Sequence, residues 1–165
     1  MKKFFITMLF LIPCIGMFAQ KGEKSVGVNI NYGTTASSVG LGAKFQYGIT
    51  DKIRIEPSLT YYFGGTGMLD ITGNVHYLFD ITPKINVYPL AGIGFDLCRY
   101  ETYNIDLYDG ISTSKETASC FKFNIGGGAE YAVAENISIG LELKYDVITD
   151  GYSQFVVGVG AKYKF

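Results

Sequence analysis

Apolar and polar residues alternate along most of the chain, and the alternation is clearest at its end. In residues 154–165 every odd position is apolar or aromatic, whereas the even positions carry glycine, glutamine, valine and two lysines. Successive residues of a β-strand point to opposite faces, so this pattern predicts a strand with one apolar face. The same period recurs upstream and no helical spacing follows residue 20. The predicted strands are Ser25–Tyr32, Val39–Gly48, Ile53–Phe63, Met68–Phe79, Lys84–Leu97, Ser119–Val133, Ile137–Asp146 and Gln154–Phe165.

The connections between these strands alternate in length. Those after the second, fourth and sixth strands are tight, whereas a long polar loop is predicted at Arg99–Thr117. Strands of about ten residues are long enough to cross a bilayer when tilted, and short turns on one side with longer loops on the other are typical of outer-membrane barrels. The sequence therefore predicts an all-β fold, an eight-stranded antiparallel up-and-down transmembrane β-barrel.

Charge follows the same phase as the alternation. The apolar phase of all eight predicted strands has no Asp, Glu, Lys, Arg or His. The opposite phase carries Lys44, Arg54, Glu56, Asp70, His76, Lys84, Asp96, Lys122, Glu130, Glu142, Lys144, Asp146, Lys162 and Lys164. Alternation alone does not say which face is inside, so a soluble secreted lipocalin-like barrel that binds a small apolar ligand is the alternative.

Three features favour the membrane barrel. Aromatic residues recur near the strand ends on the apolar phase, as an interfacial girdle requires. The predicted girdle consists of Tyr32, Tyr47, Phe63, Tyr77, Phe79, Tyr131, Tyr145 and Tyr163. Glycines lie on the charged phase, which suits a narrow lumen, and the last strand ends on the aromatic residue Phe165.

The first residues have the composition of an export signal. Lys2 and Lys3 precede an apolar stretch, and Ala19 is suitable as the last residue before cleavage. We therefore expect a signal peptide at 1–19 and the barrel domain at 20–165. A lipoprotein signal with lipidated Cys14 is an alternative, but Pro13 before it fits poorly because a small residue is usual there. The net charge of −1 gives no indication of nucleic-acid binding.

Two internal stretches and the end of the chain resemble a known family. YPLAGIGF at 88–95 and FNIGGGAEY at 123–131 resemble strands of the small OmpA/OmpX-like outer-membrane β-barrel-domain proteins, which are abundant in Bacteroidetes-type bacteria. The resemblance implies an outer-membrane location and an insertion signal that the barrel-assembly machinery reads. The residues that match this signal are Val159, Ala161, Tyr163 and Phe165. It does not imply one activity, because these barrels have diverse roles.

The polar phase predicts a lumen filled by paired charges. The residues chosen for this network are Lys44, Arg54, Glu56, Asp70, His76, Tyr88, Glu130, Glu142 and Lys144. If the tight hairpins pair symmetrically, Lys44 lies opposite Glu56, Glu56 opposite His76, and His76 opposite Tyr88. Lipid-modifying barrels of similar size use His near the lipid face, and the single histidine lies on the other phase. We therefore expect no catalytic residue, cofactor or metal, and no enzyme.

The expected role is an integral outer-membrane protein with a charge-plugged lumen that serves envelope structure or surface interaction through its outer loops. The expected partners are outer-membrane lipid and, during insertion, the barrel-assembly machinery, and the protein is expected to be a monomer. Cys98 and Cys120 bracket the predicted loop and form a candidate disulfide, since export leads to an oxidising compartment.

Overall fold

The computed structural model describes residues 21–35, 37–64, 67–106, 110–149 and 153–165, and for 98–106 and 110–118 it describes the backbone only. The predicted signal peptide, 1–19, lies outside the described residues. The strands are β1 Lys24–Gly33, β2 Ser38–Gly48, β3 Ile53–Phe63, β4 Met68–Tyr77, β5 Phe79–Thr82, β6 Ile85–Asp106, β7 Gly110–Ala132, β8 Ile137–Ile148 and β9 Gln154–Lys164. No helix in the described part of the chain is long and apolar enough to span a membrane.

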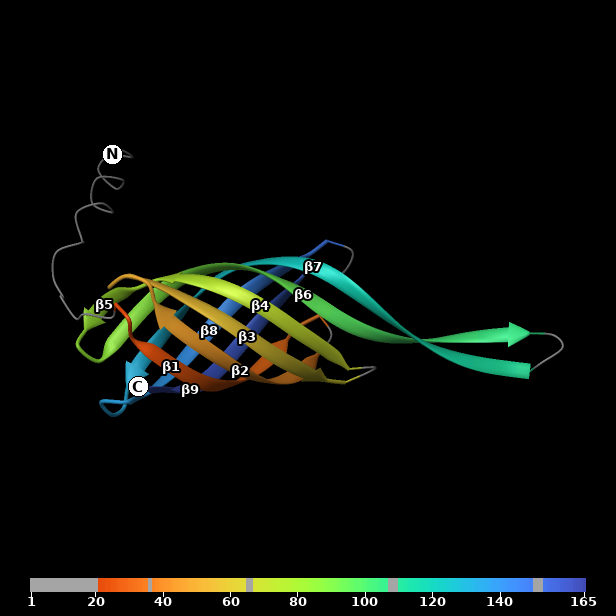
Figure 1. Cartoon of the computed structure of the whole chain (residues 1–165), viewed down its shortest axis with the longest axis horizontal. Helices are drawn as coiled ribbons and strands as arrows, with labels where there is room; N and C mark the ends of the chain where they lie inside the picture. Colours follow the sequence, from red (N-terminus) through yellow and green to blue (C-terminus); the bar gives the residue numbers. More distant parts are fainter. Residues whose placement is uncertain (1–20, 36, 65–66, 107–109, 150–152) are drawn as a thin grey trace, which may run out of the picture.

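The strands form a closed barrel in which every neighbouring pair is antiparallel (Figure 1). Their order is β4-β3-β2-β1-β9-β8-β7-β6, and β4 pairs with β6 to complete the circle. The seam joins the first strand to the last, with Val28 opposite Ala161 and Ile30 opposite Val159. This order confirms the predicted eight-stranded up-and-down barrel. Closure leaves no unpaired sheet edge in the wall of the barrel.

The fourth predicted strand is interrupted where the prediction had it continue. Met68–Phe79 ends at Tyr77 in the structure, and β5 continues the same side of the barrel against β6. At the interruption the Leu78 amide donates to the carbonyl of Lys52 at 2.7 Å. The Leu78 side chain packs inside with Tyr88 and Leu90 as a small apolar cluster. The alternation of faces continues through the break, because Leu78 is buried between the exposed residues Tyr77 and Phe79.

The predicted polar loop at 99–117 is wrong, because β6 and β7 continue through most of it. Their pairing extends without interruption to Asp106 opposite Gly110. Figure 1 shows this β6–β7 hairpin projecting past the ends of the other strands. The segment is rich in threonine, tyrosine and isoleucine, which favour strands, and polar residues suit a ribbon that has water on both faces. We call this end of the barrel the hairpin end and the opposite end the turn end.

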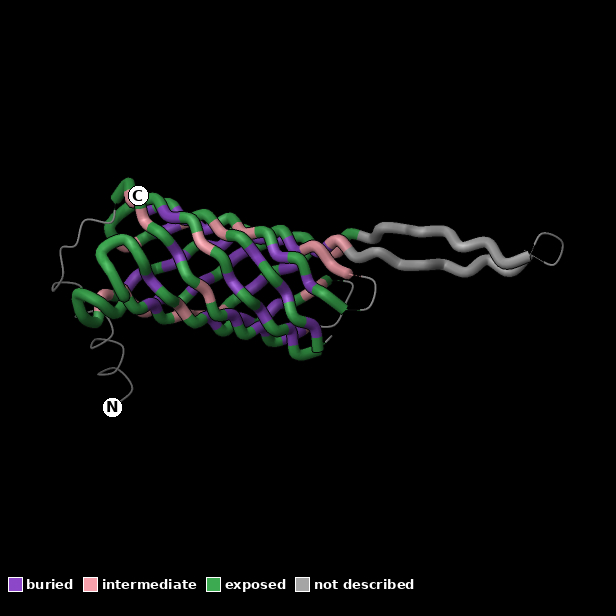
Figure 2. The backbone as a smooth tube through the Cα atoms, turned by 90° about the horizontal axis from the view of Figure 1, so that it is seen from below, coloured by how far each residue is buried: buried purple, intermediate pink, exposed green. Residues whose placement is uncertain are grey.

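The burial pattern shows which phase faces inward. Along β9 it alternates strictly from buried Gln154 to exposed Phe155 and onward, and Figure 2 shows the same alternation over the barrel. Large aliphatic and aromatic side chains are exposed around the barrel, whereas most of the buried side chains are polar or charged. A soluble lipocalin-like barrel requires the reverse arrangement, so that alternative is wrong.

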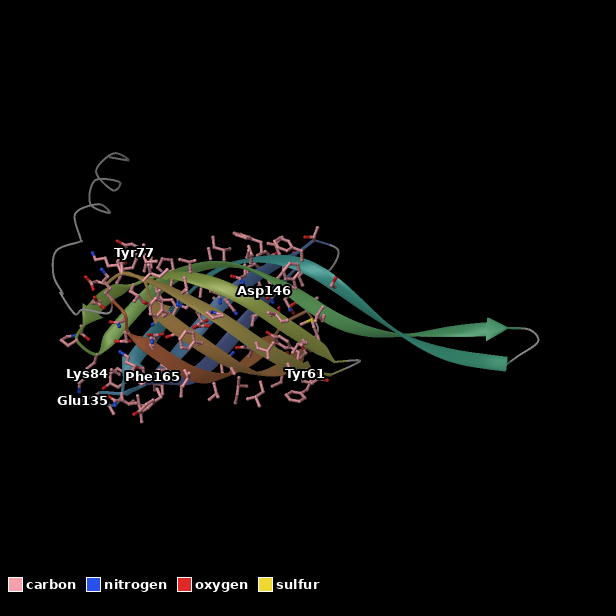
Figure 3. All side chains as sticks on the ribbon, viewed as in Figure 1. Tyr61, Tyr77, Lys84, Glu135, Asp146 and Phe165 are labelled. Carbon is pink, nitrogen blue, oxygen red and sulfur yellow. The ribbon has the colours of Figure 1, made fainter. Side chains whose placement is uncertain are left out.

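The exposed surface carries aromatic residues at both ends of the barrel. All eight side chains of the predicted girdle are exposed. Figure 3 shows Tyr61 near the hairpin end and Tyr77 near the turn end. Several of these rings contact one another, as Tyr61 does with Phe63 at a centroid distance of 5.1 Å. Aromatic side chains in these positions fit the two interfaces of a bilayer, with aliphatic side chains between them.

Candidate functional site: the charged interior of the barrel

All nine residues predicted for the lumen network lie on the inner face of the barrel. They come from β2, β3, β4, β6, β7 and β8, and each occupies an even position in the alternation. Eight of them are buried, and the side chain of Lys44 is 9% exposed. The inner face exists because each strand places every second residue there. The chemistry of the interior therefore depends on which of these side chains meet.

The first meeting point is the ammonium group of Lys44. It lies 2.7 Å from Glu142 Oε1 and 3.4 Å from Glu56 Oε2, so it joins β8 to β3 across the lumen. The hydroxyl of Tyr88 donates to the same Glu142 oxygen at 2.8 Å. Gln46 donates to Glu56 Oε2 at 2.5 Å. Charge-assisted contacts of this length are the stronger class of hydrogen bond, and here they connect opposite walls.

The second meeting point is the carboxylate of Glu130, which accepts from two cations. Arg54 donates to it through both terminal nitrogens, at 2.7 and 3.1 Å. Lys162 contacts the same carboxylate at 2.5 Å and donates to Gln46 Oε1 at 2.9 Å. The bidentate geometry holds the guanidinium plane in one orientation. Because Gln46 also contacts Glu56, the two meeting points form one connected network.

His76 and Tyr88 lie between these ion pairs. Their rings stack with centroids 4.6 Å apart and planes 7° from parallel. Arg54 is 3.0 Å from His76 Nδ1, and its guanidinium carbon lies 5.1 Å from the centre of the Tyr88 ring. His76 Nε2 is 3.7 Å from Glu56 Oε1. The histidine is fully buried in this packing and does not reach the exposed surface.

A second cluster lies nearer the hairpin end. The ammonium group of Lys122 contacts Asp70 at 2.7 Å, Asp96 at 3.1 Å and Asp146 at 3.3 Å. We call these four residues the Lys122 cluster. Figure 3 shows Asp146 in the half of the barrel towards the hairpin. Three carboxylates therefore share one ammonium group in this cluster.

The sequence reasoning missed part of this interior. The polar phase also carries Lys122, Asp96, Asp146 and Lys162. The predicted network omits these four residues, although their phase is a sufficient signal. Conversely, the predicted network includes Lys144, and no carboxylate of the described residues lies within ion-pair distance of it. The described lumen contains six buried carboxylates and, with Lys44 included, five lysine and arginine side chains.

The predicted cross-strand registers are wrong by two residues at all three hairpins. Lys44 lies opposite Ser58, Glu56 opposite Asn74, and His76 opposite Leu90. Each turn is centred one residue away from the predicted position, and a shift of one residue at the centre moves the register by two. At the β2–β3 turn, for example, the Ile53 amide donates to Thr50 Oγ1 at 2.9 Å.

The predicted neighbours nevertheless meet in space. Lys44 contacts Glu56, Glu56 approaches His76, and His76 stacks on Tyr88. Diagonal positions on adjacent strands remain within reach of long side chains, and a shift of two residues keeps every side chain on its face.

Glycines make room for the larger inner side chains. A Cβ at Gly128 would lie 2.6 Å from Cζ of Tyr88, and a Cβ at Gly40 would lie 2.8 Å from Cδ1 of Tyr62. A side chain at either position would therefore displace a buried aromatic ring. A cavity of about 240 Å³ opens at the turn end of the barrel, between β5, β6 and the ends of β1 and β9.

The two cysteines of the candidate disulfide lie on the neighbouring strands β6 and β7. Cys120 is a free cysteine and lies opposite Asp96 in the register, whereas Cys98 lies opposite Ala118. The structure therefore does not form the predicted Cys98–Cys120 bridge. The side chain of Cys98 lies outside the described residues, and a bridge in the exported protein stays a prediction. Among the described residues, no three His, Cys, Asp or Glu side chains are arranged to hold a metal ion.

Comparison with solved structures finds the same fold in several membrane barrels. The N-terminal β-barrel domain of Pseudomonas aeruginosa OprF matches with a TM-score of 0.71 at 20% identity, covering 88% of this chain and 98% of that one. Ail, the attachment invasion locus protein of Yersinia pestis, matches with a TM-score of 0.60 at 17% identity, covering 88% and 99%. OprH from P. aeruginosa matches with a TM-score of 0.64 at 12% identity, covering 87% and 99%. At these identities the likeness shows the fold alone.

The family comparison covers nearly the whole chain. No curated protein matches it. The model of the outer membrane protein beta-barrel domain matches residues 15–165. Together with the apolar exterior and the charged interior, this match shows that the chain belongs to the outer membrane protein beta-barrel domain family and is an outer-membrane protein.

Proposed function

We propose that this protein is a closed, non-conducting barrel that presents the β6–β7 hairpin at the cell surface for interaction with other surfaces. The observation that carries the proposal is the network that joins Lys44, Glu142, Glu56, Arg54 and Glu130 across the lumen. An eight-stranded barrel has room inside only for side chains or one small ligand. Here large paired side chains occupy that room.

The network supports closure for an energetic reason. Breaking a buried ion pair leaves a charge without a partner, which costs about 3–5 kcal/mol. A continuous water path would have to separate several of these pairs at once. The ion pairs therefore hold opposite walls of the barrel together. The residues that line the cavity at the turn end do not include any member of the Lys122 cluster.

Conductance tests the closed lumen directly. Purified protein in planar bilayers should give no steady single-channel current, whereas a general porin reconstituted in the same way provides the positive control. A large, steady current from the wild-type protein would contradict the proposal and indicate a porin function.

The hairpin supports a role in surface interaction. We place the turn end in the periplasm and the hairpin end outside, because short turns face the periplasm in this class of barrel. Ail shares the fold and is an attachment invasion locus protein. Attachment is thus one concrete form that the surface role of this chain would take.

A shortened hairpin separates the surface role from a role in envelope structure. Arg99 and Thr117 lie opposite each other, so residues 100–116 are replaced by Asn-Gly to form a two-residue turn. Folding is monitored by the shift between heated and unheated samples in SDS gels. We expect the shortened barrel to fold and to restore detergent resistance in a deletion strain, but not attachment or self-aggregation of cells. Full recovery of both by the shortened barrel would leave envelope structure as the function.

A further inference from the structure

One row of four residues crosses the wall of the barrel at the turn end. Lys84, directly before β6, is joined to Ala132 on β7, because the Ala132 amide donates to the carbonyl of Lys84 at 2.8 Å. Ala132 lies opposite Ser138 on β8, and Ser138 lies opposite Lys162 on β9. The row therefore has a lysine at each end and two small residues between them.

The two small residues border open space. The cavity of about 240 Å³ at the turn end is lined by Lys84, Ala132 and Ser138, and a narrower pocket beside it is lined by Ser138 and Lys162. Apart from Pro83 and Ala132, all residues that line the cavity are polar or charged. Figure 3 shows Lys84 at this end of the barrel. Because ligand pockets for apolar molecules have mainly apolar walls, this lining suits a small hydrophilic ligand.

Several hydrogen-bond donors of the cavity have no acceptor. Ser138 is 3% exposed, and its hydroxyl group forms no hydrogen bond with the described residues. Thr82 Oγ1 accepts from the amides of Lys84 and Ile85 at 3.3 and 3.0 Å, so its own O–H remains to donate. The ammonium group of Lys84 forms no ion pair with the described residues. A buried polar group without a partner is costly, so the unpaired Ser138 hydroxyl indicates a bound species.

The carboxylates of the cavity, in contrast, have cations beside them. Three carboxylates line it, namely Glu23, Asp80 and Glu130. Lys164 lies 3.3 Å from the first, and Arg54 and Lys162 both donate to the third. Asp80 has Lys52 and Lys164 as positively charged neighbours. Because the acceptors have partners and the unused groups are donors, the cavity favours an anion over a cation.

We propose that this cavity binds one small tetrahedral oxyanion, with the chemistry of inorganic phosphate, between Lys84 and Lys162. Lys162 has two hydrogen-bond partners, so its third N–H is free for the ligand. The hydroxyl groups of Ser138 and Thr82 donate between the two ammonium groups. Donors on several sides match the four oxygens of phosphate better than the two oxygens of a planar carboxylate. With the turn end in the periplasm, the ligand is a solute of that compartment, and its binding does not require an open lumen.

Equilibrium dialysis of radiolabelled phosphate against the refolded protein tests the site, in a non-ionic detergent at low ionic strength. We expect one saturable site in the wild type, with sulfate but not acetate competing for it. Lys84→Gln should weaken binding about tenfold or more, because a charged donor is lost. Lys24→Gln, which removes an exposed lysine of β1 outside the cavity lining, is the matched control and should bind as the wild type does. The gel shift of unheated samples confirms that both variants fold.

Absence of saturable binding by the wild type would overturn the proposal. An equal loss in Lys24→Gln would also overturn it, because it would show a general attraction to positive charge. Competition by acetate as strong as that by sulfate would contradict the tetrahedral ligand. A second measurement does not depend on any variant. Crystals of the wild-type protein soaked in tungstate should show an anomalous peak between Lys84, Ser138 and Lys162, and no peak there would overturn the proposal.

Discussion

Buried charges in this barrel differ in how many partners each one has. Glu130 is the sole carboxylate within ion-pair distance of Arg54 and of Lys162 among the described residues. Glu56 shares Lys44 with Glu142, which is the nearer of the two carboxylates. The loss of one carboxylate should therefore lower the free energy of unfolding most where its cation has no other carboxylate nearby.

We expect Glu130→Gln to lower the free energy of unfolding by about 3–5 kcal/mol, because two buried cations lose their partner. Glu56→Gln should cost less, about 1–2 kcal/mol, since Lys44 keeps Glu142. The measurement is urea unfolding of the refolded proteins in detergent, with Glu135→Gln on the exposed turn as the control. A larger loss for Glu56→Gln than for Glu130→Gln would contradict this account of the network.

Glycine at position 128 is required by the ring of Tyr88, which is held by stacking on His76. Gly128→Ala should destabilise the barrel by about 1–3 kcal/mol because the added methyl group meets a ring that His76 and Glu142 hold in place. Gly140→Ala is the matched control, since its nearest contacts would lie at 3.3 Å. Tyr88→Leu added to Gly128→Ala should recover part of the loss, and no recovery would show that the clash is not with the ring.

At the scale of single elements, β9 closes the barrel and also carries the exposed aromatic end of the chain. It closes the barrel by pairing with β1 and β8 along its whole length. Its outer face carries Val159, Tyr163 and, beyond its last residue, Phe165, which is 66% exposed. The Phe165 amide donates to the carbonyl of Lys24 at 2.9 Å, so the backbone there completes the seam while the ring faces outward.

Phe165→Asp should reduce the amount of folded barrel in the outer membrane several-fold, because the aromatic end of β9 is the proposed insertion signal. The folded fraction is measured from the gel shift of unheated membrane samples, with Phe165→Tyr as the control. The purified Asp variant should still refold in detergent, since the ring has no packing role inside. Failure to refold would assign Phe165 to stability and not to insertion.

At the scale of the whole molecule, the barrel has its polar residues inside and its apolar residues outside. The exposed aliphatic side chains between the two aromatic ends match a hydrocarbon layer. On the inner face, ion pairs join charged side chains from different strands. Leu141 in the middle of β8 is 54% exposed and belongs to this outer surface. A charge at such a position would face lipid with no partner.

Leu141→Arg should therefore cost about 2–4 kcal/mol in unfolding experiments in lipid bilayers if the residue lies near the midplane. The same change should cost much less in small detergent micelles, where the arginine reaches water. Leu141→Ile is the control. An equal cost in bilayers and micelles would show that the loss arises from strand packing and not from burial in lipid.

The sequence by itself determined the phase of every strand, because a period of two assigns each residue to one face regardless of register. Nearly all strand bounds and the common face of all nine predicted network residues followed from this. Only the tertiary structure decided three further features. The direction in which the sheet curves decided that the polar face is inside, since alternation is the same for a barrel of either polarity. Turn centres decided the registers, because a shift of two residues leaves the pattern of faces unchanged. Packing across the lumen decided the ion pairs, since Lys122 and Glu130 meet partners on strands that are distant along the chain.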